Sequence, residues 1–240
     1  METPVPVEWV KRRGQRTLRL RVKLDKIVVS APYRCPERDI RQFVVERLDW
    51  AIQAHAELVR KESEIGASLA LTSDRLLLRG DWKPVRVVHG PTGRKKWTWD
   101  ETDDLFTFVL HPSVPVLTAD IVKDVYKQLA AIELTERITE LGATLPFSWN
   151  RVFIRSQKTK WGTCSRDGHI SLNWRLIKCP VTIWDYLIVH ELCHTKHFDH
   201  SKAYWALVRS HYPDVDGANR WIRSNTRLVF ADPVPDVSPS

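Results

Sequence analysis

The segment HELCHTKHFDH, residues 190–200, places four histidines and a glutamate at the end of a strongly apolar stretch. Pro180 suits the first turn of a helix, and the apolar residues that follow it leave hardly any polar face, so a buried helix is expected. His190 and His194 lie one turn apart and about 40° around its axis, so both imidazoles can reach one ion, with Glu191 beside them. The pattern predicts a metal site on a buried HExxH helix.

A catalytic zinc ion usually has three protein ligands and one open position, so a third ligand is required. No glutamate follows Glu191, which excludes a glutamate ligand from a later helix. His200 lies six residues after His194, and its ring can return to the ion if the chain turns near residues 197–199. We therefore expect one zinc ion per chain, with three ligands: His190, His194 and His200.

His197 is the competing third ligand because it shares the helical face of the first two histidines. On a continuous helix it lies about 10.5 Å from His190 along the axis, whereas an imidazole ligand places zinc only about 6 Å from its Cα. Asp199 is a weaker candidate, better suited to orient a ligand imidazole. His197 and Cys193 are expected to be structural, since a three-ligand site needs neither.

The second half of the chain closely resembles the YgjP-like metallopeptidase domain, a bacterial family related to the SprT-like and other zincin peptidases. The resemblance is most specific over residues 150–212 and is carried by TKWGTCSRDGHISLNWRLIKCP, YLIVHELCH and DHSKAYWALV. It implies a zincin-like C-terminal domain with the same three zinc ligands and a catalytic glutamate at Glu191. The spacing to His200 is also that of the metzincins, but the only methionine is Met1, so the Met-turn of those enzymes cannot form.

Peptide-bond cleavage is the activity that the resemblance implies, with zinc activating a water molecule and Glu191 acting as general base. The strand HISLNW is expected to pair with an extended peptide substrate. Tyr204 and Tyr186 are candidates for stabilising the oxyanion, although Tyr204 is equally suited to packing beside Trp205. Asn173 and the Trp161–Gly162 loop resemble the family's motif flanking the site. Asn173 and Trp161 are accordingly candidate substrate contacts, with packing favoured for Trp161.

Three other functions remain open beside the peptidase. A metal-dependent nucleotide phosphohydrolase, as in family members described as UTP pyrophosphatases, would suit a basic chain, although no carboxylate cluster for Mg²⁺ is present. A DNA-associated protease of the SprT-like kind would use its charge to recruit nucleic acid. A non-enzymatic module with structural zinc is disfavoured by Glu191 beside an open coordination position.

The net charge of +8 favours anionic partners without naming one. Arg19, Arg21 and Lys23 alternate with apolar residues, as on a strand with one buried face. We interpret them mainly as a solvated face, with a nucleic-acid or nucleotide contact as the alternative, because no aromatic residues are interleaved with them.

Hydrophobic periodicity indicates an α+β fold with a β-rich N-terminal part. The resemblance implies that the part which follows is zincin-like. The expected elements are strands within 5–30, a helix from Pro36, strands at 75–80, 83–90 and 105–111 with a hairpin turn at 90–96, a long helix from Ile121 to Leu141, and strands at 148–156 and 167–174 flanking a loop. The expected domains are a β-rich region with one helix at 1–115, the metallopeptidase domain at 116–230 and a flexible tail at 231–240.

The four cysteines form no CxxC pair, so neither a zinc ribbon nor a disulfide framework is expected. No apolar run reaches the roughly 18 residues of a membrane span, and the N-terminus lacks the apolar core of a signal peptide. A cytoplasmic protein without membrane contact is therefore expected, and the sequence leaves its oligomeric state open.

Overall fold

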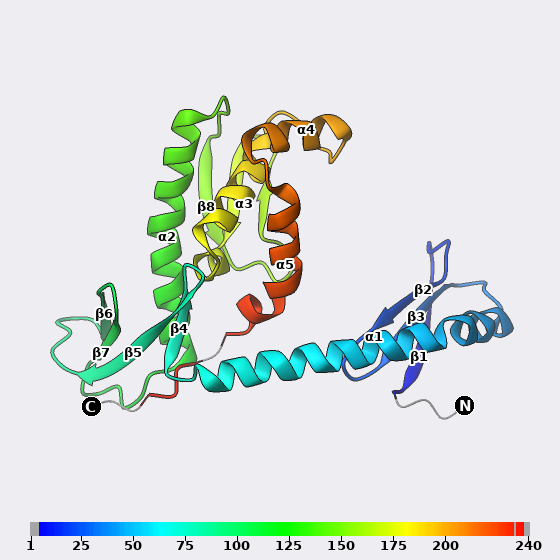
Figure 1. The fold of residues 1–240 in the computed structure, drawn as a ribbon, viewed down its shortest axis with the longest axis horizontal. Helices are drawn as coiled ribbons and strands as arrows, with labels where there is room; N and C mark the ends of the chain where they lie inside the picture. The colour runs from blue at the N-terminus through cyan, green and yellow to red at the C-terminus, as the bar shows by residue number, and fades with distance from the viewer. Residues whose placement is uncertain (1–4, 233, 238–240) are drawn as a thin grey trace. The chain divides into compact units, whose positions relative to one another are not determined.

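The computed structural model describes residues 5–232 and 234–237, apart from the side chains of Ser68 and Leu71. The chain forms two compact units that divide between Ala70 and Leu71 (Figure 1). Both units begin with strands, and the later part of the chain is mainly helical, which confirms the predicted α+β class. None of the described helices combines the length and hydropathy that a membrane span requires.

The first unit is a three-stranded sheet with a long helix packed on one face. Strand β3 is central, parallel to β1 and antiparallel to β2. Alternate residues Ile27, Val29 and Ala31 are buried, and they pack against Ile40 and Ala51 of the helix. The elements are β1 (Val7–Arg12), β2 (Arg19–Val22), β3 (Ile27–Pro32) and α1 (Glu37–Leu71).

The second unit begins with a four-stranded sheet of order β4-β5-β7-β6, formed by β4 (Arg75–Leu78), β5 (Asp81–His89), β6 (Trp97–Glu101) and β7 (Phe106–Leu110). The predicted hairpin at 90–96 is wrong, because β5 pairs with β7 in parallel and β6 pairs with β7 antiparallel. The hairpin lies one step later, where the Thr102 amide donates to the Leu105 carbonyl and the Leu105 amide to the Thr102 hydroxyl. Thr102 thus closes a tight turn between β6 and β7, and β7 lies between β5 and β6 in the sheet.

The rest of the second unit surrounds a second sheet of order β8-β10-β9. The predicted long helix and both flanking strands are present, and the intervening loop contains the short strand β9. The elements are α2 (Ala119–Thr144), β8 (Arg151–Arg155), β9 (Gly162–Cys164), β10 (His169–Asn173), a 3₁₀ helix (Trp174–Lys178), α3 (Val181–Cys193), α4 (Lys202–His211) and α5 (Val215–Phe230).

The boundary between units lies earlier in the chain than the predicted one near residue 115. The reason is a continuous hydrophobic core, in which Leu77, Phe106 and Phe108 of the four-stranded sheet join residues of α2, α3 and α5. Tyr126 of α2 adds a hydrogen bond from its hydroxyl to the Leu77 carbonyl at 3.0 Å. The four strands after α1 therefore belong with the C-terminal helices.

The predicted flexible tail is held to the second unit at its described positions. Asp232 forms ion pairs with Arg175 and the buried Lys178, and the Asp236 amide donates to the Ser73 carbonyl at 2.6 Å. Residues 233 and 238–240 lie outside the described part of the chain.

Helix α3 is the central helix of the second unit. It contacts α2, α4 and α5 as well as strands β9 and β10, with α2 and α5 on either side of it in Figure 1. Its buried residues run almost all round the helix, as its apolar composition predicts: Ile183, Trp184, Tyr186, Leu187, Ile188, Val189, Glu191, Leu192 and Cys193. A polar group near its C-terminal end is therefore held by packing on several sides.

Candidate metal centre

Helix α3 ends within the HExxH motif, earlier than the turn expected near residues 197–199. Its last helical residue is Cys193, and His194 is the C-cap. Amides of Thr195, Lys196 and His197 donate to carbonyls three or four residues earlier, which turns the chain away from the helix axis. This early turn leaves six residues in which the chain can bring a third imidazole back.

The imidazoles of His190, His194 and His200 converge at this end of α3. Their potential ligand nitrogens all lie within 4.8 Å of one another. The Nε2 atoms of His190 and His200 are 3.5 Å apart, and the ring centroid of His194 lies 5.1 Å from that of His190 and 4.8 Å from that of His200. The structure thus brings together all three residues that the sequence singled out as ligands.

The spacing of the His190 and His200 nitrogens is close to that of two ligands on one tetrahedral metal ion such as zinc. Two nitrogens bound to such an ion at about 2.05 Å are separated by about 3.4 Å, close to the 3.5 Å between His190 and His200. Burial lowers the pKa of His190 to about 3, with further lowering by the charges of His194 and His200, and burial also lowers the pKa of His194. Both rings are therefore held in the neutral form that binds a metal ion.

His197 contributes its backbone to this arrangement. Its carbonyl lies 2.9 Å from His194 Nδ1, which makes Nδ1 the protonated nitrogen and leaves Nε2 of His194 as the acceptor. His190 Nδ1, in contrast, is buried without a hydrogen-bond partner among the described residues. Asp199 accepts a hydrogen bond from the Ser201 amide at 3.2 Å, and Cys193 is buried with its pKa raised to about 12 by burial. The contacts of His197 and Asp199 support the turn.

The ring of Tyr204 packs against the three histidines. Ser201 caps α4 by accepting a hydrogen bond from the Tyr204 amide, and the helix directs the tyrosine ring against His194 with centroids 4.5 Å apart. Its fully buried hydroxyl donates to the His190 carbonyl at 3.1 Å. Because this hydroxyl is engaged by the backbone, the structure favours the packing alternative for Tyr204, and an oxyanion or substrate contact stays a prediction.

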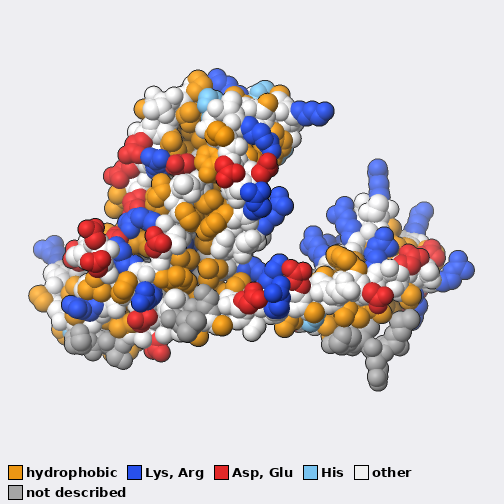
Figure 2. All heavy atoms as spheres, in the orientation of Figure 1, with side chains coloured by type: hydrophobic (Ala, Val, Ile, Leu, Met, Phe, Trp, Pro, Cys, Tyr) orange, Lys and Arg blue, Asp and Glu red, His pale blue; other side chains and the backbone are white. Residues whose placement is uncertain are grey.

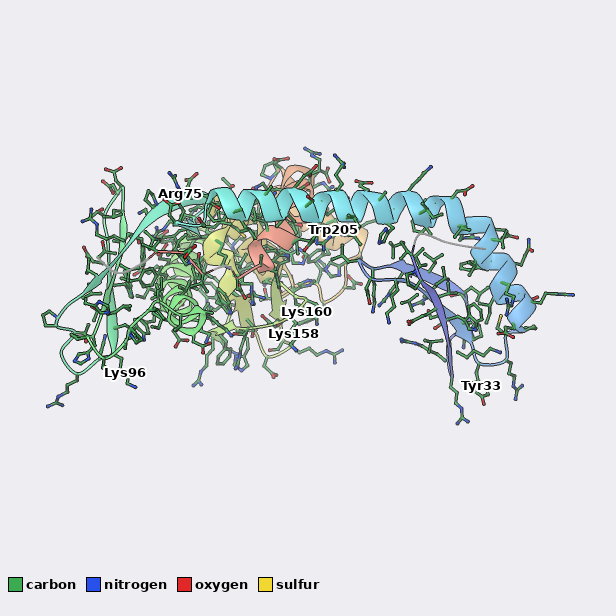
Figure 3. All side chains as sticks on the ribbon, turned by 90° about the horizontal axis from the view of Figure 1, so that it is seen from below. Tyr33, Arg75, Lys96, Lys158, Lys160 and Trp205 are labelled. Carbon is green, nitrogen blue, oxygen red and sulfur yellow. The ribbon has the colours of Figure 1, made fainter. Side chains whose placement is uncertain are left out.

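Trp205 contributes a second aromatic side chain that the sequence did not single out as part of the site. Its ring centroid lies 5.7 Å from that of His200 and 5.8 Å from that of His190 (labelled in Figure 3). A serine that can cap a helix, Ser201, followed by two adjacent aromatics is the sequence signal that could have placed both rings on the first turns of α4.

Glu191 is buried, with 4% of its surface exposed. Its carboxylate lies against Gly162 of β9, where an added Cβ would be 2.6 Å from Oε1 and 2.8 Å from Cγ. Burial raises the pKa of Glu191 to about 8, and the nearby positive charge of Lys160 lowers it. The observed position of the Glu191 side chain therefore requires a glycine at this position of β9.

Asn173 positions the loop that leads into β9. Its side-chain amide donates to the carbonyls of Gln157 and Lys160 at 2.8 and 2.9 Å, while its side-chain oxygen accepts from the Arg175 amide. These bonds occupy the fully buried side chain, so the prediction of a substrate contact at Asn173 is corrected to a loop-positioning role.

Two further candidates also have contacts within the protein. The ring of Trp161 packs edge-on against Phe230 with centroids 5.0 Å apart, in line with the favoured packing interpretation. The hydroxyl of Tyr186 donates to Asn219 at 3.1 Å, so it is not free to meet an oxyanion. Strand β10, which was expected to pair with a peptide, is instead the middle strand of its sheet and has partners on both edges.

A buried carboxylate beside three converging imidazoles is the arrangement of a metal-dependent peptidase, and sequence comparison leads to the same class. The family model described as YgjP-like, metallopeptidase domain, matches residues 16–225. The match spans most of the chain, so this protein belongs to the YgjP-like family, and membership in a metallopeptidase family implies a metal ion.

The comparison with solved structures gives a more distant likeness. The crystal structure of the metallopeptidase zymogen jannalysin of Methanocaldococcus jannaschii is similar over 39% of this chain and 97% of that chain, at 20% sequence identity and a TM-score of 0.34. No curated protein matches the sequence.

Proposed function

We propose that this chain is a zinc-dependent peptidase. His190, His194 and His200 hold one zinc ion, and Glu191 acts as the general base. The observation that carries the proposal is the convergence of three imidazole nitrogens within 4.8 Å, beside a carboxylate that is held in place by burial. Three nitrogen ligands leave the fourth position of a tetrahedral ion open, as catalytic zinc sites do.

Zinc is the metal that this ligand set favours. Imidazole nitrogens suit zinc well, whereas Mg²⁺ and Ca²⁺ prefer oxygen ligands, and no carboxylate belongs to the group of three histidines. When bound, such an ion lowers the pKa of a coordinated water towards about 7 and polarises a carbonyl group.

Glu191 supplies the proton transfer. In its carboxylate form it accepts a proton from the attacking water and passes that proton to the leaving amine nitrogen. Burial alone favours the neutral carboxyl, while the positive charge of Lys160 favours the carboxylate, as does any cation held by the adjacent histidines. Contact with Gly162 fixes the direction in which the carboxylate points.

An extended peptide is the substrate that the neighbouring sheet suits best. Strand β9 is an edge strand, and its residue Gly162 touches Glu191. A peptide that adds to this edge would gain backbone hydrogen bonds independent of its sequence and would lie next to the base. We therefore assign the pairing with an extended peptide to the edge strand β9 rather than to β10.

Nucleotide phosphohydrolysis is less suited to this site. Phosphoryl transfer commonly uses Mg²⁺ or paired metals held by carboxylates. Among the described residues, the group of potential metal ligands consists of three histidines. A nucleoside triphosphate would also meet the negative charge of an ionised Glu191.

The proposal is tested with purified protein loaded with zinc. Metal content is measured first, and turnover is then measured against a peptide library, a denatured protein and nucleoside triphosphates. One zinc per chain with peptide turnover that a chelator abolishes supports the proposal. Hydrolysis of nucleotides without any peptide cleavage would overturn it.

A further inference from the structure

A groove crosses the first unit between the edge strand β2 and helix α1. Its lining includes Arg19, Leu20 and Arg21 from the strand and Phe43, Arg47 and Trp50 from the helix. The groove is open to solvent, with a volume of about 520 Å³. It belongs entirely to the first unit and shares no residue with the candidate metal centre.

Helix periodicity explains why two aromatics and an arginine meet there. Phe43, Arg47 and Trp50 are spaced four and three residues apart, so they form one stripe along α1. This stripe runs beside the residues Ile40 and Ala51, which pack on the sheet. The aromatics that the sequence lacks beside the basic strand are therefore supplied by the helix.

The charge of the groove has a single sign. All three of its charged lining residues are arginines. Within the described residues, no carboxylate lies within 4.0 Å of Arg19 or Arg21, both of which are exposed. Figure 2 shows Lys and Arg side chains gathered over the strands of this unit. Unpaired guanidinium groups with free donors are suited to binding phosphates.

One aromatic side chain of the groove, Trp50, is exposed, whereas Phe43 is half-buried beneath Arg47. Trp50 is 57% exposed, and the guanidinium carbon of Arg47 lies 4.4 Å from the ring centroid of Phe43. The same pairing recurs in a second groove of this unit, where Tyr33 is 57% exposed and Arg13 lies 5.3 Å above its ring (Tyr33 labelled in Figure 3). Exposed aromatic faces beside arginines provide surfaces on which bases stack.

We propose that the first unit binds single-stranded nucleic acid in the groove between β2 and α1. Trp50 stacks on a base, while Arg19 and Arg21 bind the phosphate backbone; Arg47, which also pairs with Glu46 at 3.6 Å, adds positive charge to the groove. An acidic peptide would use the arginines and leave the aromatics without a role, and a duplex would keep its bases stacked away from Trp50. The combination of one charge sign with exposed aromatics therefore favours unpaired bases.

The test is binding of fluorescently labelled oligothymidine and oligouridine to the intact chain, followed by anisotropy over a range of salt concentrations. Affinity should fall steeply with salt, and Arg19→Gln/Arg21→Gln should reduce the log–log salt slope by about 1.4, since each lost phosphate contact on a single strand contributes about 0.7. Trp50→Ala should weaken binding by roughly 5- to 150-fold, the range measured for loss of one stacked base.

The matched control is Arg38→Gln/Arg60→Gln, which removes the same charge from exposed positions of α1 outside both grooves. It should change affinity by less than about threefold. The proposal is overturned if the parent chain does not bind, if control and groove variants weaken binding equally, or if Trp50→Ala has no effect. Tighter binding to duplex DNA, polyglutamate or anionic vesicles would overturn it too.

Peptide turnover provides an independent readout of the metal centre. Arg19→Gln/Arg21→Gln should cleave short peptides at the rate of the parent chain, because these arginines lie in the other unit. Loss of oligonucleotide binding with peptide turnover retained would support the groove as a nucleic-acid site that is independent of the metal centre. Equal loss of both would mean that the substitutions damage the whole protein, and would overturn a binding role confined to the groove.

Discussion

The carboxylate of Glu191 packs against the backbone of Gly162, so closely that a methyl group on that glycine would lie 2.6 Å from Oε1. Helix α3 thus packs on strand β9 at a position where the strand must carry no side chain. Gly162→Ala should therefore push the carboxylate out of position. Because a displacement of about 1 Å in a catalytic group can cost 10²-fold in rate, we expect peptide turnover to fall about 10²-fold with zinc retained.

Gly66→Ala is the control for this substitution, since an added Cβ at Gly66 meets no atom within 4 Å. Its helical position in α1 should make alanine neutral or slightly stabilising. Turnover and metal content are measured for both variants. Full activity in Gly162→Ala would show that the contact does not orient the base.

Tyr204→Phe separates a structural hydroxyl from a catalytic one. The ring and its packing on His194 are kept, and only the hydrogen bond to the His190 carbonyl is lost. Urea unfolding should show a loss of about 0.5–1.5 kcal/mol in the free energy of unfolding, and peptide turnover should change by less than about tenfold. A turnover rate lower by about a hundredfold to a thousandfold would instead be the effect of removing an oxyanion donor.

In protein freed of metal, the stability of the fold should depend on pH through Glu191. Burial raises the pKa of this carboxyl from its ordinary value of 4.5 to about 8. The folded state therefore binds the proton more tightly, so the stabilisation is complete below pH 4.5 and is lost as the pH rises through 8.

The side chain introduced by Glu191→Gln cannot ionise. The parent chain and the variant carry the same histidines, so a difference in their pH dependence reports on Glu191. Relative to the parent chain, the variant should gain roughly 1–4 kcal/mol in the free energy of unfolding between about pH 5 and about pH 9. The measurement is urea unfolding in the presence of a chelator. A difference that stays constant with pH would contradict the buried position of the ionisable group.

His200→Ala and His197→Ala should differ sharply in metal binding. His200 contributes a ring to the group of three imidazoles, so its loss should weaken zinc binding by orders of magnitude. His197 acts on His194 through its carbonyl, which alanine also carries, so this variant should keep its zinc. Metal analysis after dialysis distinguishes the two, and an empty His197→Ala beside a full His200→Ala would reverse the ligand assignment.

The sequence predicts the local features of this site better than its tertiary contacts. The spacing of His190 and His194 follows from helix geometry, and the return of His200 follows from the need for a turn. The packing of Glu191 on Gly162 could not be derived, because it depends on the pairing of β9 with β10 and on the placement of α3 against that sheet. The contacts of Tyr204 and Asn173 could not be derived for the same reason, since both side chains bond to backbone groups that are distant in the sequence.

The fold shows the same division between local and distant information. Helices α1 and α2 follow from apolar periodicity and most of the strands from alternation, whereas β6 and β9 were not predicted. The order β4-β5-β7-β6 does not follow from the sequence, because a strand pattern does not name its partner. The unit boundary at Ala70 was missed because no proline or glycine marks it: α1 continues through Leu71.

Peptide turnover by zinc-loaded Glu191→Gln, compared with the parent chain, tests the central claim most directly. The glutamine keeps the shape and the buried packing of the glutamate but cannot accept a proton, and Glu191 is not one of the three imidazole ligands. The account predicts one zinc per chain, a circular dichroism spectrum like that of the parent, and a loss of peptide turnover by several orders of magnitude. Undiminished turnover, or loss of the metal with the carboxylate, would contradict it.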